Sequence, residues 1–383
     1  MWSSITFERA DTVDYLKACL ELGKGGPIDL SLVLATSSRL SSDLVCGVLQ
    51  ASLHRSRALN VSLLDSQSAR HFIAVFQDVE LDSLLQLTVT AVVVFPVPQR
   101  RSPRHRVQLS IDRPLPRLTR LRLRGLTIEW PSTLSFHLLT CLVLMDLLTF
   151  PSWDDYCLLA SSAPLLSKLC LRNVGCTTFP RQPHSLLTFP SLTDIDLAFG
   201  TAPSSLRLVR SFVAPELKRM RFHGRSSIHF VSLALCTSLL HATHFLTLSG
   251  RCDDSFIMHF AFLNLPLLRS LDILSSDEAL LVAIATADSV LGIRGMNGPG
   301  ACPHLSALTV TQATPTQVRE FMERRGDSGA AISTIGFRGG ASQWAASPAE
   351  DLAWIRTRAM FRLLTPYQEE AWVRMDLDES VVS

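Results

Sequence analysis

Histidine and cysteine gather in one stretch of the chain, where their side chains could hold a metal ion. This stretch contains Cys236, His241, His244, Cys252 and His259. Zinc sites recruit these residue types in short and regular spacings. The spacings here fit no such pattern, and two of the histidines fall near a strand end in a repeat whose neighbours lack them. We therefore interpret these side chains as structural and expect no bound metal.

Two glycine-rich stretches could cradle phosphate groups. The glycines of 292–300 lack the dinucleotide-binding spacing and stand in a turn-rich loop, and the run at 23–26 lacks the Walker spacing. Acidic pairs at 154–155 and 253–254 stand where helices are expected to begin, and carboxylates cap helices at that end. The sequence therefore predicts no catalytic residue and no cofactor, and we expect a protein that is not an enzyme.

Charged side chains that alternate with apolar ones suggest a different chemistry, the binding of another protein. In the stretch 120–124 every second residue is an arginine, and arginine forms paired hydrogen bonds with carboxylates. The predicted protein-binding face consists of Arg120, Arg122, Arg124, Lys168, Arg172, Asp194, Asp196, Arg219, Arg221 and His223. A competing interpretation is that these charges keep exposed strands soluble and pair with one another across neighbouring strands.

The elements that would position these side chains form an internal repeat. The phrase Leu-x-x-Leu-x-Leu, with apolar replacements, recurs at 115–125, 163–174, 189–199, 214–224, 265–275 and 302–312. The central apolar residues of the expected strands are Leu121, Leu142, Leu169, Ile195, Met220, Leu246, Leu271, Leu308 and Ile335. They follow one another after 21, 27, 26, 25, 26, 25, 37 and 27 residues. Most of these spacings are typical of leucine-rich repeats.

The repeat predicts an α/β fold, a leucine-rich-repeat solenoid with irregular units of about 26 residues. The apolar residues of each phrase should point into the core, and the residues between them should point outward. Segments with a helical pattern lie between the phrases, and a proline often precedes the next strand. We expect parallel strands on the concave face and helices on the convex face.

Four regions follow from this pattern. Residues 1–95 are predicted to form degenerate helix and strand repeats, and residues 96–114 are predicted to form a basic, proline-rich loop. Residues 115–340 form the main array, and 345–383 contain terminal helices and an acidic tail. A capping-box pattern predicts a helix over 314–326, and a further helix is expected from 348 to about 364.

The amino-acid composition indicates the cellular compartment of the protein and excludes some classes of partner. The chain has 383 residues, 47% of them hydrophobic, and a formal net charge of +2, which argues against general nucleic-acid binding. Its nine cysteines include no Cys-x-x-Cys pair, as is usual in a reducing compartment. No secretory signal is visible, and the longest uncharged stretch, 83–99, is too short to span a membrane. We expect a cytoplasmic or nuclear protein without a membrane partner.

The order helix, IDLSL, helix, ALNVSL, followed by the irregular leucine-rich array, resembles the F-box and leucine-rich-repeat-like proteins of mushroom-forming (basidiomycete) fungi. Stretches like 15–34 commonly follow the F-box in that family, and a phrase like 54–59 precedes the next strand. Ala58 stands where the family usually has an aromatic residue.

The resemblance implies a substrate receptor of a cullin-type ubiquitin ligase, whose partners are the ligase adaptor and a target protein. F-box helices opening with a Leu-Pro motif do not precede Asp11. Either this is an incomplete version of such a protein, or it is a member that has lost ligase coupling. The alternative function is a stand-alone scaffold or an enzyme-inhibitor-type solenoid with no role in ubiquitin transfer.

Overall fold

The computed structural model describes residues 4–7, 13–22, 25–34, 47, 50, 52–91, 108–110, 115–129, 136–179, 186–198, 203–224, 227–250, 265–274, 281, 302–311, 313–327, 331–338 and 348–364. The chain divides into two compact units. Unit 1 comprises Met1–Leu192 with Gly200–Val213, and unit 2 comprises Thr193–Phe199 with Ala214–Ser383. Each unit is described by itself.

Unit 1 contains a parallel sheet whose strands follow one another in chain order. In the described part of the unit these are β1 (Ser4–Phe7), β2 (Ile28–Leu34), β3 (Ser56–Leu63), β4 (Gln86–Ala91), β6 (Arg120–Arg124), β8 (Cys141–Met145) and β9 (Lys168–Arg172). Two short parallel pairs accompany the sheet, β5 (Gln108–Ser110) with β7 (Thr127–Glu129) and β10 (Leu187–Thr188) with β12 (Phe212–Val213).

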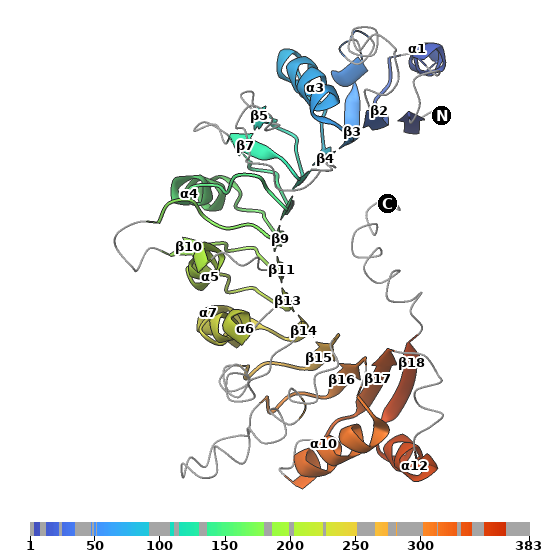
Figure 1. The fold of residues 1–383 in the computed structure, drawn as a ribbon, viewed down its shortest axis with the longest axis vertical. Helices are drawn as coiled ribbons and strands as arrows, with labels where there is room; N and C mark the ends of the chain where they lie inside the picture. Colours follow the sequence, from blue (N-terminus) through green and yellow to red (C-terminus); the bar gives the residue numbers. More distant parts are fainter. Residues whose placement is uncertain are drawn as a thin grey trace, which may run out of the picture. The chain divides into compact units, whose positions relative to one another are not determined.

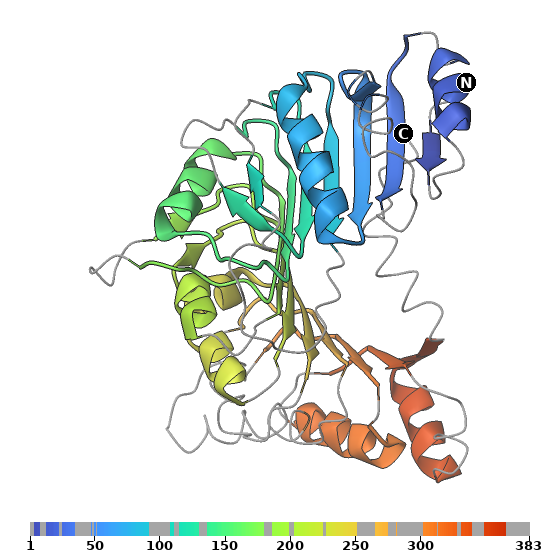
Figure 2. The same ribbon diagram turned by 45° about the horizontal axis from the view of Figure 1, so that its top comes forward.

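The helices of unit 1 are α1 (Val13–Leu22), α3 (Ser66–Asp78), α4 (Trp153–Ser162) and α5 (Pro203–Arg210). Figure 1 shows α3 and α4 on the same side of the strands, and Figure 2 shows α3 lying along the sheet. We call the opposite side the open face of unit 1.

Unit 2 also contains parallel strands that follow one another in chain order. Its described strands, in order, are β11 (Asp194–Ala198), β13 (Arg219–His223), β14 (Phe245–Ser249), β15 (Ser270–Ile273), β16 (Ala307–Val310), β17 (Thr334–Arg338) and β18 (Met360–Leu364). Its helices are α6 (Ser227–Ala234), α7 (Thr237–Ala242), α10 (Pro315–Asp327) and α12 (Ala349–Arg358). These helices lie on one side of the strands (Figure 1), and the other side is the open face of unit 2.

The apolar residue at the centre of each phrase lies in register with that of the next strand. In unit 1, Leu121, Leu142 and Leu169 are Cα partners across β6, β8 and β9. In unit 2 an equivalent row consists of Ile195, Met220, Leu246, Leu271, Leu308 and Ile335. All of these side chains are at most 2% exposed. The predicted α/β fold with parallel strands is thus confirmed, and the row of buried side chains forms the centre of each core.

A tight turn precedes many of the strands and explains the prolines. The backbone N–H of its fourth residue donates to the carbonyl of its first in the pairs Leu118 and Leu115, Leu139 and Phe136, Leu166 and Ala163, Leu192 and Phe189, Leu217 and Ala214, Leu268 and Leu265, and Leu305 and Cys302. The first and fourth residues are buried. Proline occupies the second place in all but one of these turns, where its fixed φ suits a type I turn.

A ladder of hydroxyl groups stands between these turns and the strands. In unit 1, Thr119 Oγ1 donates to the Leu85 carbonyl at 2.9 Å, and Thr140 Oγ1 donates to the Thr119 carbonyl at 3.1 Å. Ser167 Oγ continues the ladder to the Thr140 carbonyl at 3.1 Å. Ser306 and Ser333 make the equivalent bonds in unit 2. The hydroxyl groups therefore tie the start of each strand to its neighbour.

The residue directly after several strands adopts a left-handed backbone conformation. Gly125, Asp146 and Asn173 follow β6, β8 and β9, with φ of 71°, 51° and 52°. Glycine tolerates this conformation best, and Asp and Asn tolerate it better than other residues. The turn brings the chain close to its neighbour, because a Cβ at Gly125 would lie 2.3 Å from the Ala91 carbonyl oxygen.

The C-terminal part of unit 2 differs from the prediction in one element. The helix expected from 348 to about 364 ends at Arg358, and Met360–Leu364 forms the strand β18 beside β17. The backbone turns to an extended conformation at Ala359, and the Met360 N–H donates to the Ser333 carbonyl at 2.8 Å. Pairing with the exposed edge of β17 therefore overrides the helical pattern of the local sequence.

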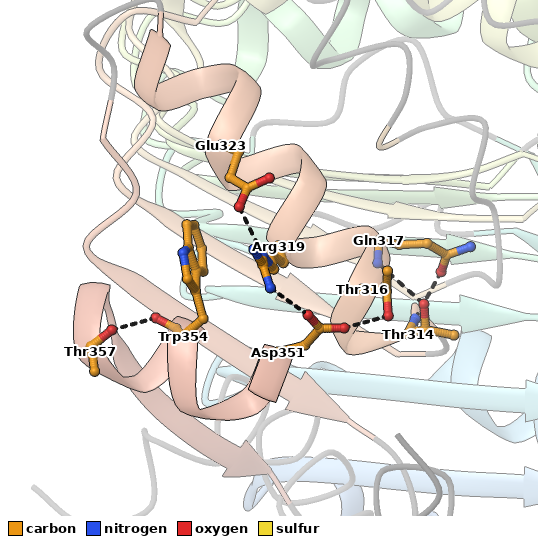
Figure 3. Close-up of polar contacts among 8 residues, drawn as sticks. All are labelled: Thr314, Thr316, Gln317, Arg319, Glu323, Asp351, Trp354 and Thr357. Atoms are coloured by element: carbon orange, nitrogen blue, oxygen red, sulfur yellow. Dashed lines mark hydrogen bonds and ion pairs between the residues drawn. The ribbon is translucent and has the colours of Figure 1, made fainter. Parts of the chain in front are cut away.

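The helix predicted over 314–326 is confirmed with its capping box. The Thr314 N–H donates to Gln317 Oε1 at 2.8 Å, and the Gln317 N–H donates to Thr314 Oγ1 at 3.3 Å. The helix α10 continues one residue beyond Gly326, the residue expected to end it. Figure 3 shows how α10 and α12 are joined by Arg319, which donates to Asp351 Oδ1 at 2.9 Å.

Several predictions fall outside the described residues. The basic loop of 96–114 is described only at Gln108–Ser110, and the glycine-rich stretch of 292–300 and the acidic tail after 364 are not described. The division into four regions therefore stays a prediction. In the part of the chain that the structure covers, no helix combines the length and apolar character that crossing a membrane requires.

Candidate functional site

The predicted binding residues fall on two open faces, one in each unit. On the open face of unit 1, Arg120, Arg122 and Arg124 alternate with two leucines that are at most 1% exposed. The register places Arg120 in one row with Cys141 and Lys168, and Arg124 in another with Met145 and Arg172. The structure therefore brings together the five basic residues that were predicted from β6 and β9, with β8 between them.

Arg122 occupies the middle row and differs from its neighbours. Its Nε atom is buried and has no hydrogen-bond acceptor among the described residues. In register it stands between Thr88 on β4 and Val143 on β8, neither of which carries a charge. A buried donor without an acceptor lowers the stability of the folded state by about 1–3 kcal/mol. Such groups are therefore uncommon in folded proteins. Arg122 is the residue of this face that most needs an external acceptor.

Arg124 already has an acidic partner. Its Nε donates to Asp146 Oδ2 at 3.0 Å, and Asn173 Nδ2 donates to Asp146 Oδ1 at 2.6 Å. Asp146 and Asn173 belong to the left-handed turns after β8 and β9. Neither residue was predicted to belong to the face. Two features of the sequence could have identified them. Both residues directly follow a strand, and both are residue types that tolerate a positive φ.

The predicted residues of unit 2 pair largely with one another. Asp194 and Arg219 are Cα partners, and Arg219 Nη1 lies 3.6 Å from Asp194 Oδ1. The Arg219 guanidinium also stands 5.9 Å from the ring centroid of Phe245, whose side chain is exposed. Mutual pairing, the competing interpretation of the charge pattern, therefore holds for Arg219.

Three side chains on neighbouring strands of unit 2 include the residue types of a proton relay. His223 Nδ1 lies 2.5 Å from Ser249 Oγ, and His223 Nε2 lies 3.4 Å from Asp196 Oδ1. The contact with Asp196 lies outside hydrogen-bond geometry, and Nε2 has no hydrogen-bond partner among the described residues. A serine nucleophile is activated when a carboxylate orients the histidine by a hydrogen bond. These contacts connect β11, β13 and β14.

A further ion pair on this face was not predicted. Arg338 Nη2 donates to Asp272 Oδ2 at 2.7 Å, and the two side chains are only 12% and 17% exposed. Arg338 lies on β17 and Asp272 on β15, so the pair spans β16. Gly336 is the Cα partner of Thr309 on β16, and a Cβ there would lie 2.8 Å from Thr309 Oγ1. The pair therefore connects β15 to β17 across β16.

The cysteine and histidine stretch is described in part. Cys236 is buried, His241 Nδ1 lies 2.9 Å from the Thr237 carbonyl, and His244 Nδ1 lies 3.0 Å from the Ala242 carbonyl. Cys252 and His259 lie outside the described residues. Within the described ranges, no group of three or more potential metal ligands comes together.

No protein-family model and no curated protein matches this chain. The two open faces and the residues that they present are therefore the features of this chain that bear on its function.

Proposed function

We propose that this protein is a leucine-rich-repeat solenoid that recognises other proteins through its open faces. The in-register rows of buried apolar residues and the helices on one side of each sheet support the solenoid assignment. Solenoids of this kind use the strand face as an extended binding surface. The protein acts by binding and not by catalysis.

The observation that carries this proposal is the open face of unit 1. Five basic side chains lie on β6 and β9, and the middle arginine has a buried nitrogen without an acceptor among the described residues. Neighbouring strands lie about 4.8 Å apart, so these residues form a broad surface. Such a surface suits a macromolecular partner with complementary charge.

The resemblance to fungal F-box proteins offers a more specific version of this function. In that version the solenoid is the substrate-binding part of a cullin-type ubiquitin ligase, and the ligase adaptor is a second partner. This version rests on the resemblance alone. The alternative is a free-standing scaffold or an enzyme-inhibitor-type solenoid.

Affinity purification of the tagged chain from its native cells, followed by mass spectrometry, tests these versions. Enrichment of the adaptor and a cullin would support the ligase version. A reproducible partner without them would support the free-standing version, and tight inhibition of a captured enzyme would identify an inhibitor. Failure to enrich any protein reproducibly would contradict the proposed recognition function.

A further inference from the structure

We propose that the open face of unit 1 binds an acidic and aliphatic segment of a partner protein. A carboxylate of the segment pairs with Arg122, a second carboxylate pairs with Lys168, and an aliphatic side chain rests on β8 between them. The proposal rests on the proposed recognition function and names the chemistry of the partner.

Arg122 provides the first anchor. Its Nε is buried without an acceptor among the described residues, while its side chain as a whole is partly exposed. A guanidinium that is partly removed from water forms stronger hydrogen bonds with a carboxylate than an exposed one does. An incoming carboxylate would satisfy the buried N–H, which is a gain that the exposed and already paired Arg124 does not offer.

Lys168 provides the second anchor. Its side chain is half-exposed, and no hydrogen bond or ion pair of its ammonium group is found among the described residues. Lys168 lies two strand spacings from β6 and two residues out of register with Arg122, which corresponds to about 12 Å between their Cα atoms. A partner must therefore present two acidic groups roughly this far apart, a distance that the long side chains of Arg122 and Lys168 can adjust.

The strand between the two anchors is apolar. On the open face, β8 presents Cys141, Val143 and Met145, and Val143 is only 8% exposed although it points away from the helices. This strip lies in the same rows as the basic residues on either side. It matches an aliphatic side chain flanked by two acidic ones, which occurs in an extended segment such as Glu-x-Val-x-Glu.

The positive charge of this face favours an acidic partner. The apolar strip on β8 and the absence of aromatic side chains from the described strands of this face favour a protein over a nucleic acid. Among the described open-face residues of β4, β6, β8 and β9, none is acidic, and Asp146 at the strand ends is held by Arg124 and Asn173. These strands present no aromatic side chain on which a base could stack. The apolar strip would also form neither hydrogen bonds nor ion pairs with a phosphate backbone.

The test uses the full chain and a fluorescent peptide made of Glu-Ser-Val-Ser-Glu repeats, with fluorescence anisotropy as the measurement. We expect saturable binding that weakens with added salt. Arg122→Gln should weaken it about tenfold or more, and Lys168→Gln should weaken it about threefold, because a charged hydrogen bond is worth more at the buried site. Arg324→Gln on α10, an exposed arginine outside the open faces, is the matched control and should leave peptide binding unchanged.

Further probes separate the outcomes. A peptide with Gln in place of Glu should not bind, and one with Ser in place of Val should bind more weakly. Equal or tighter binding of a single-stranded oligonucleotide that is lost in Arg122→Gln would overturn the proposal in favour of a nucleic-acid face. Absence of peptide binding, with a native partner still captured and insensitive to Arg122→Gln, would overturn the acidic-segment proposal while leaving the recognition function intact.

Discussion

Arg122 and Arg124 lie on the same face of β6 but have different surroundings. The Arg124 guanidinium pairs with Asp146, whereas the buried Nε of Arg122 has no acceptor among the described residues. The alternation of arginine and leucine predicts that both side chains point outward, and it does so correctly. The alternation does not reveal which of the two arginines has an acidic partner. Asp146 follows another strand and lies 22 residues after Arg124 in the chain.

Gly125 is a position at which a single added methyl group should destabilise unit 1. Its φ is 71°, and a Cβ would lie 2.3 Å from the Ala91 carbonyl oxygen. We expect Gly125→Ala to lower the free energy of unfolding by about 2–4 kcal/mol, through strain and the displacement of β4 from β6. Chemical denaturation monitored by circular dichroism measures this loss.

Gly326→Ala is the matched control for this substitution. Gly326 lies in α10, where an added Cβ meets no atom within 4 Å. Alanine favours the helical conformation, so this variant should gain up to about 1 kcal/mol of stability. If both variants lose the same stability, the loss cannot be attributed to the close approach at Gly125.

At the scale of single elements, the hydroxyl ladder makes a small and measurable contribution to strand pairing. Thr140→Val keeps the shape of the side chain but removes the hydrogen bond to the Thr119 carbonyl. This carbonyl still accepts the N–H groups of residues 140 and 141, so no buried acceptor is orphaned. We expect a loss of about 0.5–1.5 kcal/mol in the free energy of unfolding.

Thr140→Ser distinguishes the hydroxyl group from the methyl group. It retains the Oγ donor and should therefore stay closer to the parent protein than Thr140→Val does. The reverse order of stabilities would show that packing of the methyl group, and not the hydrogen bond, is what the threonine contributes. The same denaturation measurement decides between the two.

The contact between α10 and α12 should make unit 2 sensitive to acid. Thr316 Oγ1 donates to Asp351 Oδ2 at 2.6 Å, and this bond lowers the pKa of Asp351 below its ordinary value of 3.8. The Arg319 guanidinium lowers it further, against the opposing effect of desolvation. Because the pKa is lower in the folded protein, Asp351 stabilises it fully above the ordinary pKa, and this contribution disappears as the pH falls through the folded-state pKa.

Asp351→Asn tests this dependence. The variant should be less stable than the parent protein at pH 7, and the difference should shrink as the pH is lowered through about 4 and below. Unfolding experiments at a series of pH values, followed by the fluorescence of Trp354 and the other tryptophans, measure the difference. A stability difference that stays constant down to pH 2 would contradict the role assigned to the carboxylate.

The elements that the sequence predicts well share a repeated local signal. Most of the strands alternate between apolar and polar residues, and the turns before many of them have buried residues at their ends, usually with proline between them. The strand β18 lacks this signal, since Met360, Arg362 and Leu363 are all exposed. Its extended conformation comes from pairing with β17, which is a long-range contact that a local pattern does not encode.

At the scale of the whole molecule, the ten predicted binding residues divide between two open faces. Their outward orientation follows from strand period and could be predicted from sequence. Their ion pairs could not, because a pair such as Arg338 with Asp272 depends on which strands lie two places apart. The sequence therefore predicts which side chains point outward, and the structure shows which of them form ion pairs.

A double charge reversal tests whether these faces recognise a partner. We expect Arg122→Glu combined with Arg221→Glu to abolish capture of the native partner, because like charges would then oppose its acidic groups. Circular dichroism and thermal unfolding should remain close to those of the parent, since both side chains are partly exposed. Quantitative mass spectrometry of the captured proteins measures the loss.

Reversal of two arginines outside the open faces provides the control. Arg117 lies in the turn before β6 and Arg324 lies on α10, and both are exposed. Arg117→Glu with Arg324→Glu changes the net charge equally and should leave capture intact. Unchanged capture by the Arg122 and Arg221 double variant would remove the open faces from consideration as the binding surface.

The order of the strands also has a consequence for synthesis of the chain on the ribosome. Within each unit, every strand of the main sheet pairs with the strand that precedes it in the sequence and then with the one that follows. The central residues of paired strands are separated by 21 to 37 residues from β6 to β9 and from β11 to β17, so the entropy lost in closing each connection is small and similar. Each new strand emerges after its partner is complete, and within each unit structure can therefore grow from the N-terminal end as translation proceeds.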